Sequence, residues 1–357
     1  MVNVTETFLP LFEEYTEQLK RVWDSKWLTN RGILVQELET KLKEFLGVNN
    51  LLFVNNGTIA LQIAIKALSL SGEIITTPFS YVATVSSIVW ENCTPVFVDI
   101  NPDYLTIDET KIEAAITEKT SAILATHVFG NPCNVEAIET IAKKHNLKVV
   151  YDAAHCFGVN YKGQSILNWG DVSTLSFHAT KLFHTGEGGG IVCRNADVAH
   201  RAFYMHNFGH NGQEDFWGLG INGKASELHA AMGLCLLPYL DEIITKRKAV
   251  SQLYDELLVK TDLTKPFVRE GTEYNYSYYP ILFSSEKQLL KAKEDLNNER
   301  IFPRRYFYPS LTTLPYIQQG AASIAKEVSE RILCLPLYPN IGPQVVEQIC
   351  RIIRRSI

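Results

Sequence analysis

Short apolar runs alternate with longer amphipathic stretches through the first two thirds of the chain. Continuous apolar runs bounded by turn residues are typical of strands that are buried on both faces of a sheet. Because these runs alternate with helix-like segments, the pattern predicts an α/β layer around a largely parallel sheet. The runs predicted as strands are residues 51–54, 73–77, 95–100, 121–129, 148–152, 172–177 and 189–193.

Apolar residues at three- and four-residue spacing predict helices between these strands. The clearest cover residues 58–70 and 134–146, and Asn134 is the expected N-cap of the second. After about residue 224 a long helix-like stretch begins, and Pro238 within it is expected to kink or split the helix.

The pattern of the last third differs, with a predicted strand over 276–284 and a predicted helix over 285–299. A chain of 357 residues is too long for one small core. We therefore predict a large domain, residues 1–240, and a smaller α+β domain, residues 241–357.

Composition and charge exclude several classes of protein. A net charge of −5 argues against a general nucleic-acid binder. The seven cysteines are scattered and never form a CxxC pair, so they predict buried small hydrophobic residues rather than disulfides or a zinc site. The first residues lack a basic region followed by an apolar one, and no apolar run is long enough to span a bilayer. We therefore expect a cytoplasmic protein.

The stretch NNGTIAL (residues 55–61) follows the first predicted strand and opens the first predicted helix. Gly57 permits a tight turn, and Thr58 offers a hydroxyl and a backbone N–H. A helix start of this kind suits an anion such as phosphate. Alone, a Gly-Thr pair here is more often a simple turn and cap.

Asp152 ends the apolar run 148–152, where an unpaired carboxylate would be costly. It is either a helix N-cap or a carboxylate that holds a cationic ring nitrogen. His155 follows within the same turn and is either a core histidine or a second ligand contact.

The stretch LSFHATKLFHTGEGGGIV (residues 175–192) places Ser176 and Lys181 between a predicted strand and a glycine-rich turn. Glycines allow the backbone to approach closely. A lysine made neutral by burial or by a nearby positive group is a good nucleophile toward carbonyls, although a lone lysine is usually solvated.

Pyridoxal 5'-phosphate (PLP) has one group for each of these three places: a phosphate, a pyridinium nitrogen and an aldehyde. Its enzymes commonly pair a Schiff-base lysine with an acidic partner of the ring nitrogen. Ligands of α/β sheets bind at the carboxyl ends of the strands, where all three places are expected. The combination therefore predicts a PLP site.

Three motifs, YDAAHCFG (151–158), SFHATKLFHTGEGG (176–189) and GINGKASELHAAMGL (220–234), together resemble the nucleotide-sugar aminotransferases of the DegT/DnrJ/StrS family. The resemblance covers essentially the whole chain. It implies the aspartate aminotransferase fold, fold type I of the PLP enzymes, with a mostly parallel mixed sheet and a smaller α+β C-terminal domain.

The resemblance also implies roles for individual residues. Lys181 corresponds to the Schiff-base lysine, and Asp152 to the partner of the pyridine nitrogen. His155 stands where many members have Gln, beside the cofactor's ring oxygen. Tyr81 stands where the family places an aromatic residue that stacks on the ring, its alternative being an ordinary core tyrosine. The phosphate-binding positions are matched by Gly57, Thr58 and Ser176.

Asn222 matches an asparagine that the family lends across a dimer interface to the partner's cofactor phosphate, which implies a homodimer with shared active sites. Its alternative is a turn residue flanked by glycines. Glu187 either orders its loop or belongs to the site. Many members read N-L-T-T where this chain has LFHT (182–185), so His184 either tunes substrate choice or fills space.

The stretch FPRRYFYPSL (302–311) resembles a subset of the family that makes 4-amino-4,6-dideoxyglucose on a dTDP carrier. Arg304, Arg305 and Tyr306 are expected to meet a diphosphate or the carboxylate of the amino donor, or else to form exposed ion pairs.

The resemblance thus implies a two-stage transamination, in which L-glutamate supplies the amino group and a dTDP-4-keto-6-deoxy-D-glucose takes it at C4. A 3-keto isomer that gives a 3-amino sugar is the nearest alternative. A PLP-binding regulator without turnover is the alternative from another class. A nucleotide-binding dehydrogenase is disfavoured, because LLFVNNGTIAL lacks the GxGxxG fingerprint.

Overall fold

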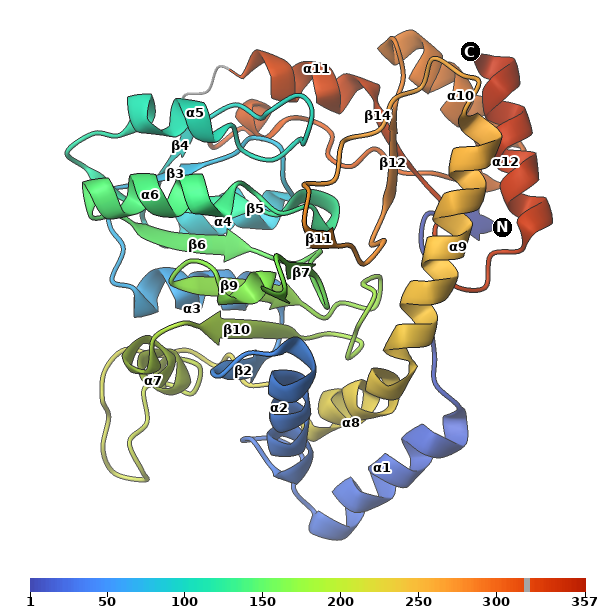
Figure 1. Cartoon of the computed structure of the whole chain (residues 1–357). Coiled ribbons are helices and arrows are strands. Elements are labelled where there is room, and N and C mark those ends of the chain that lie inside the picture. The colour runs from blue at the N-terminus through green and yellow to red at the C-terminus, as the bar shows by residue number, and fades with distance from the viewer. Residues whose placement is uncertain (318–321) are drawn as a thin grey trace.

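A seven-stranded sheet lies at the centre of the computed structural model, which describes residues 1–317 and 322–357 (Figure 1). Strand β10 is antiparallel to both of its neighbours, and the other strand pairs of the sheet are parallel. The predicted mixed, mostly parallel sheet is therefore confirmed. In spatial order the strands are β2 (Leu51–Val54), β10 (Gly189–Cys193), β9 (Val172–Ser176), β6 (Lys148–Asp152), β5 (Thr120–Thr126), β3 (Glu73–Thr76) and β4 (Thr94–Phe97).

Each apolar run predicted as a strand overlaps one of these strands, and β2, β6 and β10 match their predicted bounds. The runs over 95–100 and 121–129 both extend beyond their strands, since β4 ends at Phe97 and β5 ends at Thr126. The chain turns there, and Phe129 adopts a left-handed φ of 58°. An apolar run therefore marks burial, but it does not mark where a buried strand turns.

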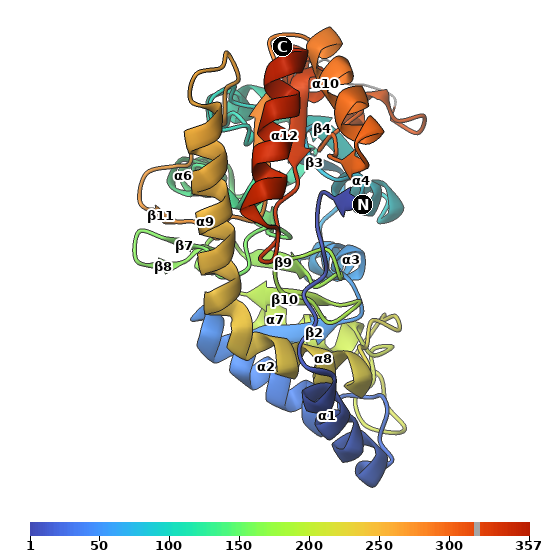
Figure 2. The same ribbon diagram turned by 90° about the vertical axis from the view of Figure 1, so that its right-hand side faces the viewer.

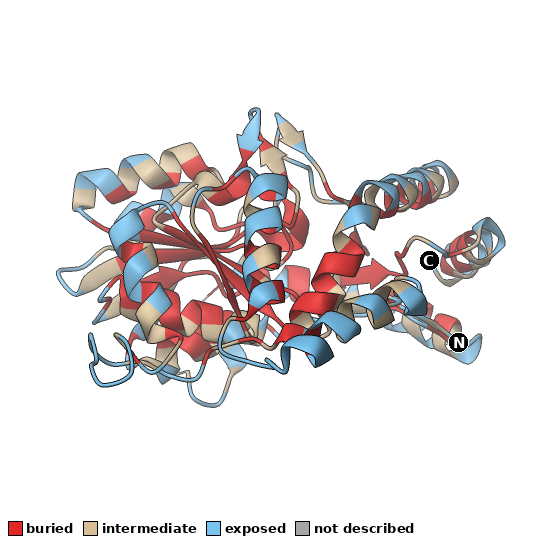
Figure 3. Cartoon of the chain, turned by 90° about the horizontal axis from the view of Figure 1, so that it is seen from below, coloured by how far each residue is buried: buried red, intermediate tan, exposed pale blue. Residues whose placement is uncertain are grey.

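Helices cover both faces of the sheet, as continuous apolar strands require. One face packs against α3 (Gly57–Ala67), α4 (Val82–Trp90) and α7 (Ala196–Met205). The other packs against α2 (Ile33–Leu46), α6 (Val135–His145) and α8 (Glu227–Leu236). Figure 3 shows the buried residues gathered in the sheet and on the helix surfaces that face it.

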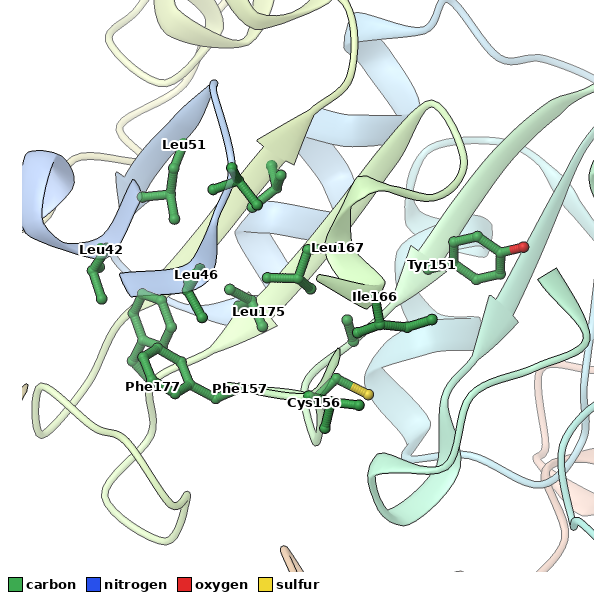
Figure 4. Close-up of a cluster of buried hydrophobic side chains, with 14 of the residues drawn as sticks. Leu42, Leu46, Leu51, Tyr151, Cys156, Phe157, Ile166, Leu167, Leu175 and Phe177 are labelled. Carbon is green, nitrogen blue, oxygen red and sulfur yellow. The ribbon is translucent and has the colours of Figure 1, made fainter. Parts of the chain in front are cut away.

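The core on the α2 side is continuous from that helix to the sheet. Leu42 and Leu46 of α2 lie in one cluster with Leu51 of β2 and Leu175 of β9 (Figure 4). Phe177, directly after β9, is fully buried in the same cluster. The end of β9, which leads to Lys181, is therefore anchored from the interior.

The predicted break at Pro238 is confirmed. Helix α8 passes through a 3-10 turn, Leu237–Tyr239, into α9 (Leu240–Leu258). By length and composition this continuous helix could cross a membrane, the one such helix among the described residues. Its most apolar window is 44% buried within the fold, and α8 packs against α1 (Phe12–Ser25) and α2. A core helix passes the same test, so the helix is weak evidence for a membrane.

A second, smaller core follows in the chain. It is built on the antiparallel pair β12 (Tyr279–Leu282) and β14 (Ile332–Leu335), which packs against the helices of the C-terminal part. These helices are α9, α10 (Glu286–Asn298) and α12 (Pro343–Ser356), whereas α11 (Ser323–Arg331) packs against the same strand pair in a separate cluster.

The N-terminus joins this smaller core. Strand β1 (Val2–Asn3) pairs in parallel with β13 (Ile301–Phe302), and the N-terminal label in Figure 2 lies beside α12. The predicted domain boundary at residue 240 stays a prediction. It assigns the first residues to the large domain, although β1 pairs with a strand of the C-terminal part. The chain starts in the smaller core, crosses to α1 and returns through α9.

Small secondary elements complete the fold. All seven cysteines are unpaired and buried, which confirms their prediction as buried hydrophobic residues. The remaining elements are the helix α5 (Glu109–Ile112) and a small sheet of β11 (Thr272–Glu273), β7 (Asn160–Tyr161) and β8 (Gln164–Ser165).

Candidate active site

A cavity of about 250 Å³ opens at the carboxyl ends of β5, β6 and β9, beside the N-terminus of α3. Residues of the smaller core complete its wall. Most of the predicted site residues line it: Gly57, Thr58, Tyr81, Asp152, His155, Ser176, Lys181, Glu187, Arg304 and Tyr306.

One end of the cavity is built to hold an anion. Asn56 caps α3 by accepting a hydrogen bond from the Ile59 N–H at 2.8 Å. The amides of Gly57 and Thr58 donate to no acceptor within the described residues. The Ser176 side chain, at the end of β9, lies opposite, because a Cβ on Gly57 would come within 3.0 Å of its Cβ. Two free amides, two hydroxyls and a helix start suit a phosphate.

The glycine run after Lys181 brings β10 against this turn. A Cβ on Gly189 would lie 2.5 Å from the carbonyl oxygen of Asn56, closer than side chains tolerate. Gly186 adopts a left-handed φ of 79° and turns the chain into β10. The glycines therefore allow the lysine-bearing loop and the α3 turn to share one wall.

The Asp152 carboxylate lies at the end of β6 and is buried. Thr84 donates to its Oδ2 at 2.7 Å, and the Ala154 N–H donates to its Oδ1 at 3.1 Å. Burial raises the pKa of Asp152, while these two hydrogen bonds and the charge of Lys181 lower it. The chain continues in turns and not as a helix, so the N-cap interpretation is wrong. The carboxylate is arranged to receive a cation.

Lys181 is buried in the same cavity. Burial lowers the pKa of its amine from 10.5 to about 8, and the charges of Asp152 and Tyr81 partly oppose this effect. Its Nζ lies 5.9 Å from the ring centroid of Tyr278. An amine with this pKa is neutral in roughly a tenth of the molecules at pH 7. Lys181 is therefore a competent nucleophile and proton acceptor.

His155 is both buried and part of the cavity wall, which resolves its two interpretations. Its Nδ1 accepts a hydrogen bond from the Phe129 N–H at 3.1 Å. Burial, and then the charge of Lys181, lower the pKa of the imidazole well below its ordinary value. The neutral ring must therefore carry its proton on Nε2, which makes it a hydrogen-bond donor.

Polar and aromatic residues line the rest of the cavity. Tyr81 is 54% exposed at the start of α4, so it is not a core tyrosine. Glu187 lies 3.7 Å from the Nε2 of His178 at the rim. Arg304 lies over the ring of Tyr306, 5.0 Å from its centroid, and forms no ion pair with a described acidic residue. Its guanidinium therefore has no acidic partner among the described residues, and a role in substrate binding stays a prediction.

Two predicted substrate contacts are corrected, because neither lines the cavity. His184 is 1% exposed, and its Nε2 lies 2.7 Å from the carbonyl oxygen of Phe8. Arg305 donates to Glu286 at 2.7 Å and stacks on Tyr308. Both side chains hold parts of the fold together.

Asn222 also lies outside the cavity of its own chain. It is exposed, and its backbone pairs with that of Asn207 in the segment that follows α7. A position on the outer surface is what a residue lent to a partner requires, but the shared site stays a prediction.

The sequence reasoning missed several residues that the fold brings to the cavity. Thr84 lies on α4 with no motif around it, and it reaches Asp152 only because the first turn of α4 lies at the carboxyl end of β6. Tyr278 belongs to a predicted strand of the smaller domain, and its ring lies 4.7 Å from that of His155. Neither could be assigned without knowing which segments meet. The missed residues are Ser80, Thr84, Thr126, His178, Thr180, Tyr278 and Phe307.

The comparison with protein families decides which enzymes the chain resembles. The DegT/DnrJ/EryC1/StrS aminotransferase family matches residues 11–354. The chain belongs to this family. It is therefore a PLP-dependent sugar aminotransferase with the fold of that group.

Named relatives agree over nearly the whole length of the chain. A dTDP-4-amino-4,6-dideoxy-D-glucose transaminase of Shigella dysenteriae is 43% identical, over 99% of this chain and 98% of the relative. A GDP-perosamine synthase of Escherichia coli O157:H7 is 31% identical, over 94% of this chain and 93% of the relative. The crystal structure of DesI with its TDP-sugar product has a TM-score of 0.94 at 31% identity, covering 99% of this chain and 92% of DesI.

The residues of the cavity fit the cofactor of this family. Free amides and hydroxyls at the α3 end match a phosphate, and the buried Asp152 carboxylate matches a ring nitrogen that carries a proton. Lys181 supplies the amine that an aldehyde requires. The three groups come from three different elements and meet only in the folded chain.

The depressed pKa of Lys181 predicts how its reactivity depends on pH. Because only the neutral amine reacts, labelling of Lys181 in the PLP-free protein by formaldehyde and cyanoborohydride should rise with pH and level off above about pH 8. Exposed lysines should continue to gain reactivity up to their ordinary pKa of about 10.4. Peptide mass spectrometry across pH 6–10 measures both classes in one sample. A Lys181 rate that still climbs at pH 10 would contradict the assignment.

Proposed function

We propose that this family member transfers the amino group of L-glutamate to C4 of dTDP-4-keto-6-deoxy-D-glucose, giving dTDP-4-amino-4,6-dideoxy-D-glucose and 2-oxoglutarate. The observation that carries the proposal is the Shigella relative of that name, which matches almost the entire chain at 43% identity. The DesI structure supports a TDP-linked substrate. The enzyme acts in the cytoplasm in this proposal, and its product is a precursor for O-antigen or another surface glycan.

The cofactor is held at three points in this proposal. The amides of Gly57 and Thr58, with Ser176, bind its phosphate. Asp152 holds the proton of its ring nitrogen, and Tyr81 packs on its ring. Once bound, PLP supplies the aldehyde that takes the amino group and a ring that accepts electrons.

Lys181 moves the proton in both halves of the reaction. Its neutral amine takes a proton from Cα of glutamate, and in the second half it delivers a proton to C4 of the sugar. The amine lies in one cavity with Asp152 and Tyr81, so glutamate and the keto sugar must both bind in this cavity. His155 donates its Nε2 proton to the ring oxygen of the cofactor.

Arg304 binds an anionic part of the substrates. It has no acidic partner among the described residues, and its guanidinium lies over the ring of Tyr306. The carboxylate of glutamate and the diphosphate of the sugar nucleotide both suit a bidentate arginine. Glu187 stays a member of the site through its place at the rim beside His178.

The functional unit is a homodimer with shared active sites. Large apolar side chains are exposed on α1, on the turn that follows it, at the first residue of α2 and on the segment after α7, and Asn30 of that turn lines one hollow with residues of that segment. An apolar surface of this extent is typical of a protein interface. Asn222 lies in the same segment, where it can reach the cofactor phosphate of the partner. The exposed residues are Trp23, Trp27, Leu28, Ile33, Phe208, Phe216, Trp217, Leu219 and Ile221.

The substrate assignment predicts a clear preference in a panel of keto-sugar nucleotides. With glutamate as the donor, dTDP-4-keto-6-deoxy-D-glucose should give 2-oxoglutarate and a product whose NMR spectrum places the amine at C4. UDP- and GDP-linked 4-keto sugars and a dTDP-3-keto sugar should react at least about tenfold more slowly, the discrimination that one lost polar contact gives.

Other outcomes would identify the alternatives. An amine at C3 would replace the 4-aminotransferase with the 3-aminotransferase. A protein that binds PLP but forms no 2-oxoglutarate with any member of the panel would favour a regulator without turnover. The Lys181→Ala variant is the control, because it keeps the phosphate contacts and loses the amine.

The shared site predicts complementation between two inactive variants. Lys181→Ala removes the amine of one chain, and Asn222→Ala removes the contact lent to the partner. A mixed dimer then holds one complete site, so an equal mixture after subunit exchange should recover about a quarter of the wild-type activity. No recovery, with mixed dimers demonstrated by mass spectrometry, would place Asn222 in the site of its own chain, and a fully active Asn222→Ala variant would place it in neither site.

A further inference from the structure

The N-terminal segment, residues 1–11, joins the smaller core to the large one. Val2 and Asn3 pair with β13, and the Val4 carbonyl accepts a hydrogen bond from the Leu337 N–H at 3.0 Å. The chain then runs down to α1 along the side of the molecule (Figure 2). On this path it passes the loop that carries Lys181, here called the lysine loop, residues 178–187.

Two hydrogen bonds join the N-terminal segment to the lysine loop, one on each side of Lys181. The Thr7 hydroxyl donates to the Ala179 carbonyl at 3.0 Å. The His184 Nε2 lies 2.7 Å from the Phe8 carbonyl. Thr7 and Phe8 are neighbours, so the segment spans the loop from before the lysine to after it.

The bonds of His184 leave no free nitrogen for a substrate. Its Nδ1 accepts the Gly186 N–H at 3.2 Å, so the neutral ring carries its proton on Nε2 and donates it to the Phe8 carbonyl. Burial lowers the pKa of this imidazole, which keeps it neutral at physiological pH. A threonine, the residue that many family members have here, is too short to make both bonds.

Apart from the two bonds to the N-terminal segment, the hydrogen bonds of the lysine loop lie within it or reach back only to the Phe177 carbonyl, and its other contacts with the core are apolar. Its Ala179 N–H bonds the Gly186 carbonyl, and its Lys181 N–H bonds the His178 carbonyl, both at 2.8 Å and both within the loop. Phe183 stacks on Phe157 from the core side, with ring centroids 4.4 Å apart. The N-terminal segment is the restraint on the opposite side.

We propose that His184 is a positioning residue that ties the N-terminal segment to the lysine loop and so holds the Lys181 amine inside the cavity. The reaction that it serves rests on the proposed function, but the tie itself can be measured without turnover. Because the segment is anchored in the smaller core, the tie also fixes the lysine relative to the wall that carries Tyr278 and Arg304.

Two substitutions separate the two bonds of His184. The amide nitrogen of Gln in His184→Gln can take the place of Nε2 and donate to Phe8. The shorter side chain of His184→Asn can reproduce only the acceptor for Gly186. Both variants therefore bury an amide side chain, and only the Gln variant keeps the hydrogen bond to the N-terminal segment.

The first readout is the pH profile of Lys181 labelling by formaldehyde and cyanoborohydride in the full-length PLP-free protein. His184→Asn should move the midpoint upward by about one pH unit, because a loosened amine is more solvated. His184→Gln should stay within about 0.3 pH units of the wild type. Hydrogen exchange over residues 178–187 should rise in the Asn variant and stay near the wild type in the Gln variant.

The second readout is the kinetics of the PLP-loaded enzyme. His184→Asn should lower kcat about tenfold or more and change the KM values less than about threefold, because a displaced catalytic group affects chemistry more than binding. If the Asn variant does not fold, Thr7→Val removes the other tie at nearly constant volume and should shift the same midpoint.

The outcomes decide the proposal in each case. Equal Lys181 labelling midpoints in the Gln and Asn variants would overturn the proposal. So would a His184→Asn variant whose melting temperature falls while its Lys181 midpoint stays that of the wild type. If the wild type aminates none of the keto sugars, the proposed function fails, and the labelling and exchange experiments still test the tie.

Discussion

The burial of the Lys181 amine opposite the Asp152 carboxylate is the interaction on which the rest of the site depends. Burial lowers the pKa of the lysine and raises that of the aspartate, and the charge of each opposes the shift of the other. Among the described residues no ion pair neutralises either group, and the hydrogen-bond donors to Asp152 are a hydroxyl and a backbone N–H. Burial of two charged groups of this kind lowers the stability of the fold. It is useful only if a bound ligand interacts with both groups.

The architecture places these two groups at one edge of a rigid sheet. Asp152 ends β6 and Ser176 ends β9, and these neighbouring strands are parallel. The α3 turn reaches the same edge because Gly57 and Gly189 allow backbone and strand to touch. The smaller core then covers the cavity with Tyr278 and other residues that the sheet does not carry.

Much of this could be predicted from the sequence because the signals are local. Strands β2, β6 and β10 are buried on both faces and read as apolar runs, and the groups at their ends are the polar residues that interrupt this pattern. This interruption predicts Asp152 and Lys181 as candidate site residues. A resemblance to the family added Tyr81, and it favoured the ligand contact among the two interpretations that the local pattern left open for His155.

Other features could not be predicted, because they depend on partners far away in the chain. His184 bonds to Phe8, which lies 176 residues earlier, and Arg305 pairs with Glu286 on another element. The hydroxyl of Thr84 meets Asp152 across 68 residues. The sequence of LFHT or PRRY does not show whether a side chain lines the cavity or bonds to another part of the fold.

The central claim, that Lys181 is the amine that takes up the cofactor, has a direct test. The protein is loaded with PLP, reduced with borohydride and digested, and the phosphopyridoxyl group is located by mass spectrometry. We expect one modified lysine, Lys181, in the PLP-loaded protein. The modified peptide should be absent from the Lys181→Ala variant and from a PLP-free sample, and it should be reduced in the Asp152→Ala variant, which binds the cofactor more weakly. Stoichiometric modification of another lysine, with Lys181 unmodified, would contradict it.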